Sequence, residues 1–245
     1  MTRRSFHNQL DEVRNGLVRL AAYVTESLPR ATEALLSGDA TLCAELIAAD
    51  DVVDELAASI EDHCYHLLAL QQPMAGDMRA IVTAIRLASE IERSGDLVVN
   101  VAKAANRIRM LPIDHVTRGL VDRMSEEALG LFLFAVDAYV DHDFAHAAAL
   151  DEMDDCLDAV HREFIGQVLQ SCRNGHLEVQ AAVQLALVGR YYERIGDHAV
   201  NMGERLCYMV NGWRPGAPAP ALMRGLDGPE TAPRGPAVTD GARHR

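Results

Sequence analysis

A nine-residue pattern occurs twice in this chain of 245 residues, and its two copies start 101 positions apart. The first copy, ERSGDLVVN, covers residues 92–100, and the second, ERIGDHAVN, covers residues 193–201. Glu, Arg, Gly, Asp, Val and Asn recur at the same places in both copies, which we call the signatures. Self-similarity over this distance indicates a fold built from two copies of one unit.

Acidic residues outside the signatures extend the match. Four pairs lie 104 positions apart: Asp39 with Asp143, Asp50 with Asp154, Asp51 with Asp155, and Asp54 with Asp158. The offset is smaller at the signatures, so the turn before the second signature is expected to be shorter, a change that turns tolerate. The sequence therefore predicts one repeat over residues 1–113 and another over residues 114–213.

Apolar residues follow a helical spacing throughout both repeats. Gly, Pro and Asx residues divide each repeat into three helices, expected at about residues 6–36, 39–70, 77–110, 117–139, 143–171 and 176–211. Asp39 is expected to cap the second helix. The predicted fold class is all-α, with two tandem antiparallel three-helix bundles related by pseudo-symmetry. Six of the nine prolines fall within residues 214–245, which predicts a disordered Pro- and Gly-rich tail there.

The net charge and the cysteine content limit the classes of function that are plausible for this chain. The formal net charge of −13 argues against a nucleic-acid binder, which needs a basic surface to displace counterions, and favours cations as ligands. Five cysteines without a CxxC spacing indicate neither a disulfide framework nor a zinc knuckle, as in a protein of the reducing cytoplasm. The longest apolar stretch is far shorter than the roughly 18 residues that a membrane span needs, so direct membrane insertion is not expected.

Each signature places two carboxylates one helical turn apart. Glu92 and Asp96 project from one face of a helix, and so do Glu193 and Asp197. On a helical wheel this face coincides with the apolar stripe, so the acids are expected in or beside the packing seam. Carboxylates moved from water toward an apolar seam are costly unless protons, arginines or metal ions neutralise them.

Two kinds of compensating group remain open. Arg93 and Arg194 follow the signature glutamates, and each could reach a carboxylate of a neighbouring helix. Alternatively, the acids hold metal ions, because oxygen ligands suit Fe, Mn, Mg or Ca, and Zn as well if a histidine joins them. Recurrence of the whole signature favours metal, since a solvated face imposes no residue identity. The secondary ligands or orienting groups of such a site would be Asn100, Asn201, His198 and Glu204.

The second helix of each repeat carries a further pair of acids. Asp50 and Asp54 lie four residues apart in the first repeat, and their counterparts follow 104 residues later. They could face the signatures across a bundle, but we favour helix-dipole charge or simple exposure as the interpretation. The mid-helix glycines Gly95 and Gly196 predict a close approach of a neighbouring helix or a ligand.

Two segments that contain the signatures, RLASEIERSGDLVVNVAK and GRYYERIGDHAVNMGE, resemble the PhoU family of phosphate-signalling proteins. The resemblance covers about residues 5–213. It implies a cytoplasmic all-α protein, usually a homodimer, whose Glu/Asp-x-x-x-Asp motifs hold iron or zinc. By position, Glu92 and Asp96 form one such motif, and Glu193 and Asp197 form the other.

The same resemblance implies a negative regulator of phosphate uptake and of the phosphate-starvation response. Its implied partners are the ATPase of the phosphate ABC transporter and a membrane sensor histidine kinase, to which the protein is recruited peripherally. The second signature region has His198 and Glu204 where the first has Leu97 and Lys103. This difference predicts unequal metal occupancy, because Lys103 can take the place of a cation.

Two other classes of function compete with this interpretation. A metal-free helical scaffold or adaptor needs no ligand at the signatures. A carboxylate-bridged di-metal enzyme needs two Glu-x-x-His motifs, and the nearest match is Asp158-x-x-His161. A Gly-rich phosphate loop, a Ser-His-Asp order and an activated cysteine are all missing from the sequence, so no enzymatic activity is predicted.

Overall fold

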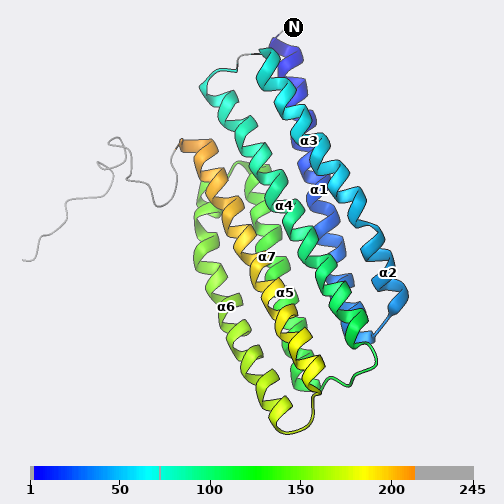
Figure 1. Cartoon of the computed structure of the whole chain (residues 1–245). Coiled ribbons are helices and arrows are strands. Elements are labelled where there is room, and N and C mark those ends of the chain that lie inside the picture. The colour runs from blue at the N-terminus through cyan, green and yellow to red at the C-terminus, as the bar shows by residue number, and fades with distance from the viewer. Residues whose placement is uncertain (1–2, 72, 213–245) are drawn as a thin grey trace, which may run out of the picture. The chain divides into compact units, whose positions relative to one another are not determined.

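The computed structural model describes residues 3–71 and 73–212, and these fold into seven helices (Figure 1). Their bounds are α1 Arg3–Ser37, α2 Ala40–Ala48, α3 Asp50–Gln71, α4 Ala75–Ile108, α5 His115–Asp141, α6 Phe144–Arg173 and α7 Val179–Asn211. The predicted all-α class is confirmed. The tail predicted for residues 214–245 lies outside the described residues.

Matching aspartates start matching helices in the two repeats. The Asp39 carboxylate accepts hydrogen bonds from the backbone N–H groups of Thr41 and Leu42 at 2.8 and 3.1 Å. Asp143, 104 residues later, accepts the same two bonds at the same distances at the start of α6. Each carboxylate satisfies backbone donors that lack a partner within the helix, so the predicted cap at Asp39 is confirmed.

One predicted helix is broken. The segment expected to be continuous over residues 39–70 divides at Ala49 into α2 and α3, whereas the matching α6 runs unbroken. Ala49 closes α2 through a bond from its N–H to the Glu45 carbonyl, and its own carbonyl accepts from Val52 at 3.2 Å. Asp50 and Asp51 occupy the first turn of α3, where the helix dipole favours negative charge. The single-helix prediction was therefore wrong here.

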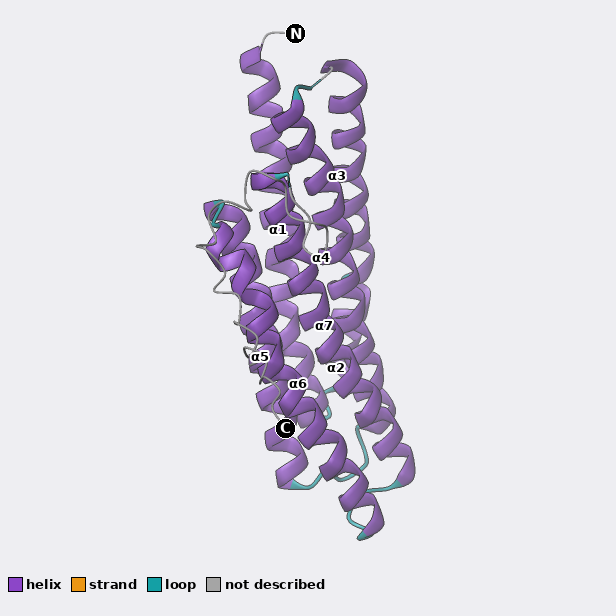
Figure 2. Ribbon diagram, turned by 90° about the vertical axis from the view of Figure 1, so that its left-hand side faces the viewer, coloured by secondary structure: helices purple, strands orange, loops and turns teal. Residues whose placement is uncertain are grey.

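The helices form two bundles that share a long interface. Helices α1 to α4 form the first bundle and α5 to α7 the second, and the two meet where α4 packs on α7 and α1 packs on α5. Figures 1 and 2 show these helices running lengthwise beside one another. One continuous apolar core joins them, with Leu20, Leu87, Phe132 and Tyr192 among its fully buried side chains.

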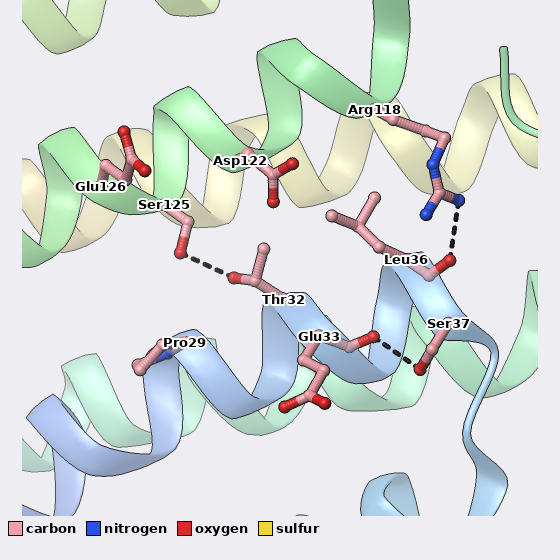
Figure 3. A pocket seen from close by; sticks show the side chains of 9 residues that line it. All are labelled: Pro29, Thr32, Glu33, Leu36, Ser37, Arg118, Asp122, Ser125 and Glu126. Carbon is pink, nitrogen blue, oxygen red and sulfur yellow. Dashed lines mark hydrogen bonds between the residues drawn. The ribbon is translucent and has the colours of Figure 1, made fainter. Parts of the chain in front are cut away.

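A reciprocal pair of arginines shows the approximate symmetry between the repeats. Arg118 of α5 donates to the carbonyl of Leu36 in the last turn of α1, at 2.7 Å (Figure 3). Arg14 of α1 donates to the carbonyl of Val140 in the last turn of α5. Both donors and both acceptors are 104 residues apart, so one contact is made twice in opposite directions. This supports the predicted pseudo-symmetry.

A groove of about 420 Å³ lies between α1 and α5, next to the Arg118 contact. Thr32 and Ser125 line this groove with buried hydroxyls that the dashed line in Figure 3 joins, and their oxygens are 2.7 Å apart. The Thr32 oxygen is also 2.7 Å from the phenol oxygen of Tyr192 on α7. Buried hydroxyls need such partners, so this trio ties three helices of both repeats together.

The division predicted at residue 113 stays a prediction. Helix α4 ends at Ile108 and α5 begins at His115, so the boundary falls in the connection between them. None of the helices in the described part of the chain is long and apolar enough to cross a membrane.

Candidate metal centres

Four acids of α3 and α4 converge in the first repeat. Asp50 and Asp54 lie one turn apart on α3 and face Asp96 of α4, and one oxygen from each carboxylate lies within 4.8 Å of the others. Glu92 stands one turn before Asp96 and is half-buried. We call Asp50, Asp54, Glu92 and Asp96 the first cluster.

Burial and mutual repulsion raise the pKa of two acids of the first cluster, Glu92 and Asp50. Burial raises the pKa of Glu92, and the neighbouring carboxylates of Asp96 and Asp54 raise it further. Burial likewise raises the pKa of Asp50, with Asp96 and Asp54 adding to the effect and Lys103 opposing it. Because each acid disfavours ionisation of the next, a cation placed among them would relieve the repulsion.

The second repeat places four matching acids on α6 and α7. We call Asp154, Asp158, Glu193 and Asp197 the second cluster. Burial raises the pKa of Asp154 to about 6, helped by the charges of Asp158 and Asp197. Burial and Asp197 also raise the pKa of Glu193. Atoms Oδ1 of Asp154 and Oε2 of Glu193 are buried and have no hydrogen-bond partner, so each lacks the compensation that a buried carboxylate oxygen needs.

The acids of α3 and α6 lie where our less favoured alternative placed them, opposite the signatures. Asp54 is exposed, as expected, but Asp50 and Asp54 also face Asp96, and the charges of Asp197 and Glu193 act on Asp154. Their recurrence at a fixed offset, which helped to define the two repeats, also marks them as site residues by the argument that singled out the signatures. Four acids per repeat, rather than two, make up each candidate site.

The signature glycines allow the helices to approach each other closely. A Cβ atom on Gly196 would stand 2.5 Å from Oδ1 of Asp154 and 2.6 Å from Leu157. A Cβ atom on Gly95 would stand 3.3 Å from Val53. The predicted reason for these glycines is confirmed, and the approach is closer in the second repeat.

The arginines beside the signature glutamates do not compensate the acids as ion-pair partners. Arg93 and Arg194 are exposed, and neither makes an ion pair with a carboxylate among the described residues. Instead, Arg190 of α7 pairs with Oε1 of Glu193, and another of its nitrogens lies 3.9 Å from Oδ2 of Asp197. Residues three or four apart share a helix face, whereas adjacent residues point about 100° apart.

His198 and Asn201 serve the interface between the repeats. Nδ1 of His198 lies 2.7 Å from Oε2 of Glu90 on α4, and Asn201 donates to the same oxygen at 3.3 Å. Burial acts to raise the pKa of Glu90, but the bond and charge of His198 lower it overall. Both side chains were expected as secondary groups of the metal site, and the structure places them on Glu90 instead.

Two further secondary candidates are half-buried. Asn100 and Glu204 make no side-chain hydrogen bond within the described residues. His161, which lies on α6 three residues after Asp158, was noted from the sequence only as a near match to a di-metal motif and not as a ligand beside the signatures. Its Nε2 atom is buried without a hydrogen-bond partner, and its ring packs against Gly189, where a Cβ would stand 3.2 Å from it.

The donor atoms of the first cluster converge as a metal site requires, whereas among the described residues those of the second cluster do not yet converge in this way. The first cluster offers only carboxylate oxygens, which are the ligands of hard cations such as Mn, Mg or Ca and of iron. The second offers carboxylate oxygens, and the charge of Asp158 acts on the nearby ring of His161, whose unpartnered nitrogen is a ligand type that suits zinc or iron. The unpartnered buried oxygens of Asp154 and Glu193 are the observation that best fits a cation.

Comparison with known proteins identifies the same repeated unit. A family model described as the PhoU domain matches residues 17–105 and again residues 121–206. The phosphate-specific transport system accessory protein PhoU homolog 2 of Mycobacterium tuberculosis is 35% identical over 211 residues, which cover 86% of this chain and 98% of that protein. The PhoU homolog of Deinococcus radiodurans is 32% identical over 216 residues, covering 86% and 99%.

Solved structures show the same fold. The crystal structure of PhoU from Pseudomonas aeruginosa superposes with a TM-score of 0.80 at 24% identity, covering 85% of this chain and all of that one. The phosphate transport system regulatory protein PhoU from Streptococcus pneumoniae superposes with a TM-score of 0.79 at 23% identity, covering 85% and 98%.

Proposed function

Because this chain belongs to the PhoU family, we propose that it is a negative regulator of phosphate uptake and of the phosphate-starvation response. The observation that carries the proposal is the match of the family model to both repeats, together with relatives named as accessory proteins of the phosphate-specific transport system. In this role the chain is a cytoplasmic homodimer that links the ATPase of a phosphate ABC transporter to a sensor histidine kinase in the membrane.

The fold suits such an adaptor. Two bundles joined by one core present separate faces in a fixed relation, so a partner held by one bundle can bias a partner held by the other. Regulation then requires that the chain bind the inactive state of the kinase more tightly than the active state.

We extend the proposal to metal ions, with iron or zinc as the first candidates and Mn, Mg or Ca as others. Asp50, Asp54 and Asp96 would hold an ion in the first cluster, with Glu92 beside them. Asp154, Asp158, Glu193 and Asp197 would hold one in the second. A bound cation would neutralise the acids and cross-link the second and third helices of its repeat.

A metal-free scaffold is the second candidate function, and a specific observation favours it. Each cluster already has a basic side chain nearby, since Lys103 opposes the rise that burial causes in the pKa of Asp50, and Arg190 pairs with Glu193. These internal cations could make metal unnecessary for folding.

Deleting the gene tests the regulatory proposal. The deletion strain, with any paralogue also removed, should express a phosphate-starvation reporter in phosphate-rich medium. Reintroducing the intact chain should silence the reporter. A reporter that stays silent in the double deletion would contradict the proposal.

Elemental analysis of the purified full-length chain separates the metal-binding adaptor from the metal-free scaffold. We expect metal in the intact protein and a loss of it in the Asp54→Asn/Asp96→Asn variant. Glu55→Gln is the matched control, because Glu55 is exposed beside Asp54 and lies outside the cluster. Equal metal content in all three proteins would refute the first cluster as a site, and reporter silencing by the Asp54→Asn/Asp96→Asn variant would favour the scaffold.

A further inference from the structure

Arg190 distinguishes the second cluster from the first. Its guanidinium pairs with Oε1 of Glu193 and lies 3.9 Å from Oδ2 of Asp197, so it reaches both signature carboxylates. The matching position in the first repeat, 101 residues earlier, is Ser89, which carries no charge. The second cluster therefore contains a cation that belongs to the chain itself.

That cation and a metal ion exclude each other. Arginine stays protonated at any pH a protein meets, so the guanidinium cannot become a ligand. A divalent ion held by Glu193 and Asp197 would stand within a few ångströms of this positive charge, and two positive charges so close repel strongly at a half-buried site. The metal can bind only after the guanidinium has moved away.

Such a movement is open to Arg190. The Arg190 side chain is 52% exposed, whereas that of its partner Glu193 is only 14% exposed. The arginine stem is long and flexible, and its charged end can be hydrated as soon as it leaves the cluster. The carboxylate, in contrast, stays in place when the arginine departs.

We propose that Arg190 is a tethered cation that keeps the second cluster closed to metal until its guanidinium swings into solvent, so that the two clusters load at different metal concentrations. The inference rests on the proposed metal binding. The first cluster, whose three aspartate oxygens already converge, loads first. The second loads only when the free metal concentration is high enough to displace Arg190.

His161 lies near the second cluster and would give a metal bound there a nitrogen ligand. Its Nε2 atom is buried without a hydrogen-bond partner, and the charges of both Asp158 and Arg190 act on its ring. The matching residue of the first repeat is Ala57, which offers no ligand. An imidazole nitrogen beside carboxylates favours Zn²⁺ over Mn²⁺, so the second cluster is the more zinc-selective of the two.

The test substitutes residues of the first repeat into the second. Arg190→Ser and His161→Ala are made in the full-length chain with the first cluster disabled by Asp54→Asn/Asp96→Asn. Arg194→Ser is the control, since it removes an exposed arginine of the same helix that has no carboxylate partner among the described residues. Zn²⁺ and Mn²⁺ affinities are measured by competition with a chromophoric chelator after EDTA treatment.

Arg190→Ser should bind both ions at least about tenfold more tightly than the control, because no ion pair has to be broken first. His161→Ala should weaken Zn²⁺ binding and leave Mn²⁺ binding nearly unchanged. Without metal, Arg190→Ser should also unfold at a lower temperature than Arg194→Ser. Added Zn²⁺ should raise the unfolding temperature of Arg190→Ser to that of the control.

The outcomes separate the inference from the function on which it rests. If Arg190→Ser binds neither ion more tightly than Arg194→Ser, Arg190 is not a gate and the inference is overturned. The chain with an intact first cluster is titrated in parallel. Absence of metal there refutes the proposed metal function of the first cluster, whatever the Arg190 variant does. Equal effects of His161→Ala on both ions overturn the zinc preference.

Discussion

The first and second clusters use acids at four matching positions, yet the neighbours that neutralise them differ. Lys103 acts on Asp50 from three residues beyond the first signature, whereas Arg190 enters the second cluster and pairs with Glu193. Beside the first cluster, Gly95 packs against the aliphatic side chain of Val53. Beside the second cluster, Gly196 packs against the carboxylate of Asp154. Duplication preserved the acidic ligand set, while the surrounding positions diverged and changed its accessibility.

The largest effect is expected from His198→Leu, which copies Leu97 of the first repeat. The substitution leaves Glu90 buried with Asn201 as its remaining partner, so the free energy of unfolding should fall by about 3 kcal/mol. Urea denaturation measures the change. The double variant Glu90→Leu/His198→Leu should recover most of it, and a double variant as unstable as the single one would contradict a hydrogen bond that compensates the burial of Glu90.

Gly196→Ala and Gly95→Ala compare how tightly the two clusters pack. In the second repeat the added Cβ meets Asp154 and Leu157 at less than 3.0 Å, so we expect destabilisation of about 2 kcal/mol. In the first repeat the nearest atom is 3.3 Å away, and the better helix propensity of alanine offsets most of the cost. Thermal unfolding of both variants checks the ranking, which equal losses would disprove.

The pH dependence of stability should be larger for the second cluster. Burial raises the pKa of Asp154 in the folded state from its ordinary 3.8 to about 6, so the folded state holds the proton more tightly and stability falls as pH rises through this range. Asp154→Asn stays neutral and should gain about 1 kcal/mol over the parent chain between pH 4.5 and 7.5, after a discount for solvent screening. Urea denaturation at both pH values, with Asp50→Asn as the comparison, measures it. A gain that does not change with pH would show that Asp154 titrates normally.

The smallest effect is expected from Lys103→Ala. Lys103 is exposed and acts on Asp50 only through its charge, so its loss should cost no more than about 0.5 kcal/mol. The pKa of Asp50 should rise further, which NMR titration of its carboxyl can follow. If Lys103→Ala lowered the free energy of unfolding as much as Arg190→Ser does, the two basic residues would act alike.

The helical class, the duplication and the signature helices could be predicted because each leaves a direct trace in the sequence. Helical spacing, repeated residue identities and capping aspartates depend on local chemistry. The break at Ala49 has no glycine or proline to mark it, since it depends on how α2 and α3 pack on α4. The spacing of apolar residues along the chain carries no information on how one helix packs on another, so it could not predict this break.

Contacts between the repeats were harder to predict for a related reason. The residue that matches Glu90 in the second repeat is Tyr191, and the residue that matches His198 in the first repeat is Leu97. Both Glu90 and His198 therefore depart from the repeat pattern. They come together only because α4 and α7 run antiparallel in one particular register. The repeat pattern does not mark Arg190, because it lies outside the signature and Ser89 holds its position in the first repeat, although a helix brings residues three apart onto one face.

The reciprocal arginines Arg14 and Arg118 make the two halves of the molecule energetically dependent on each other. Each closes the last turn of a helix that belongs to the opposite half, so separating the halves strips both helix ends of a donor at once. The shared core adds to this dependence. Despite its duplicated sequence, the described body should melt as one cooperative unit rather than as two domains in succession.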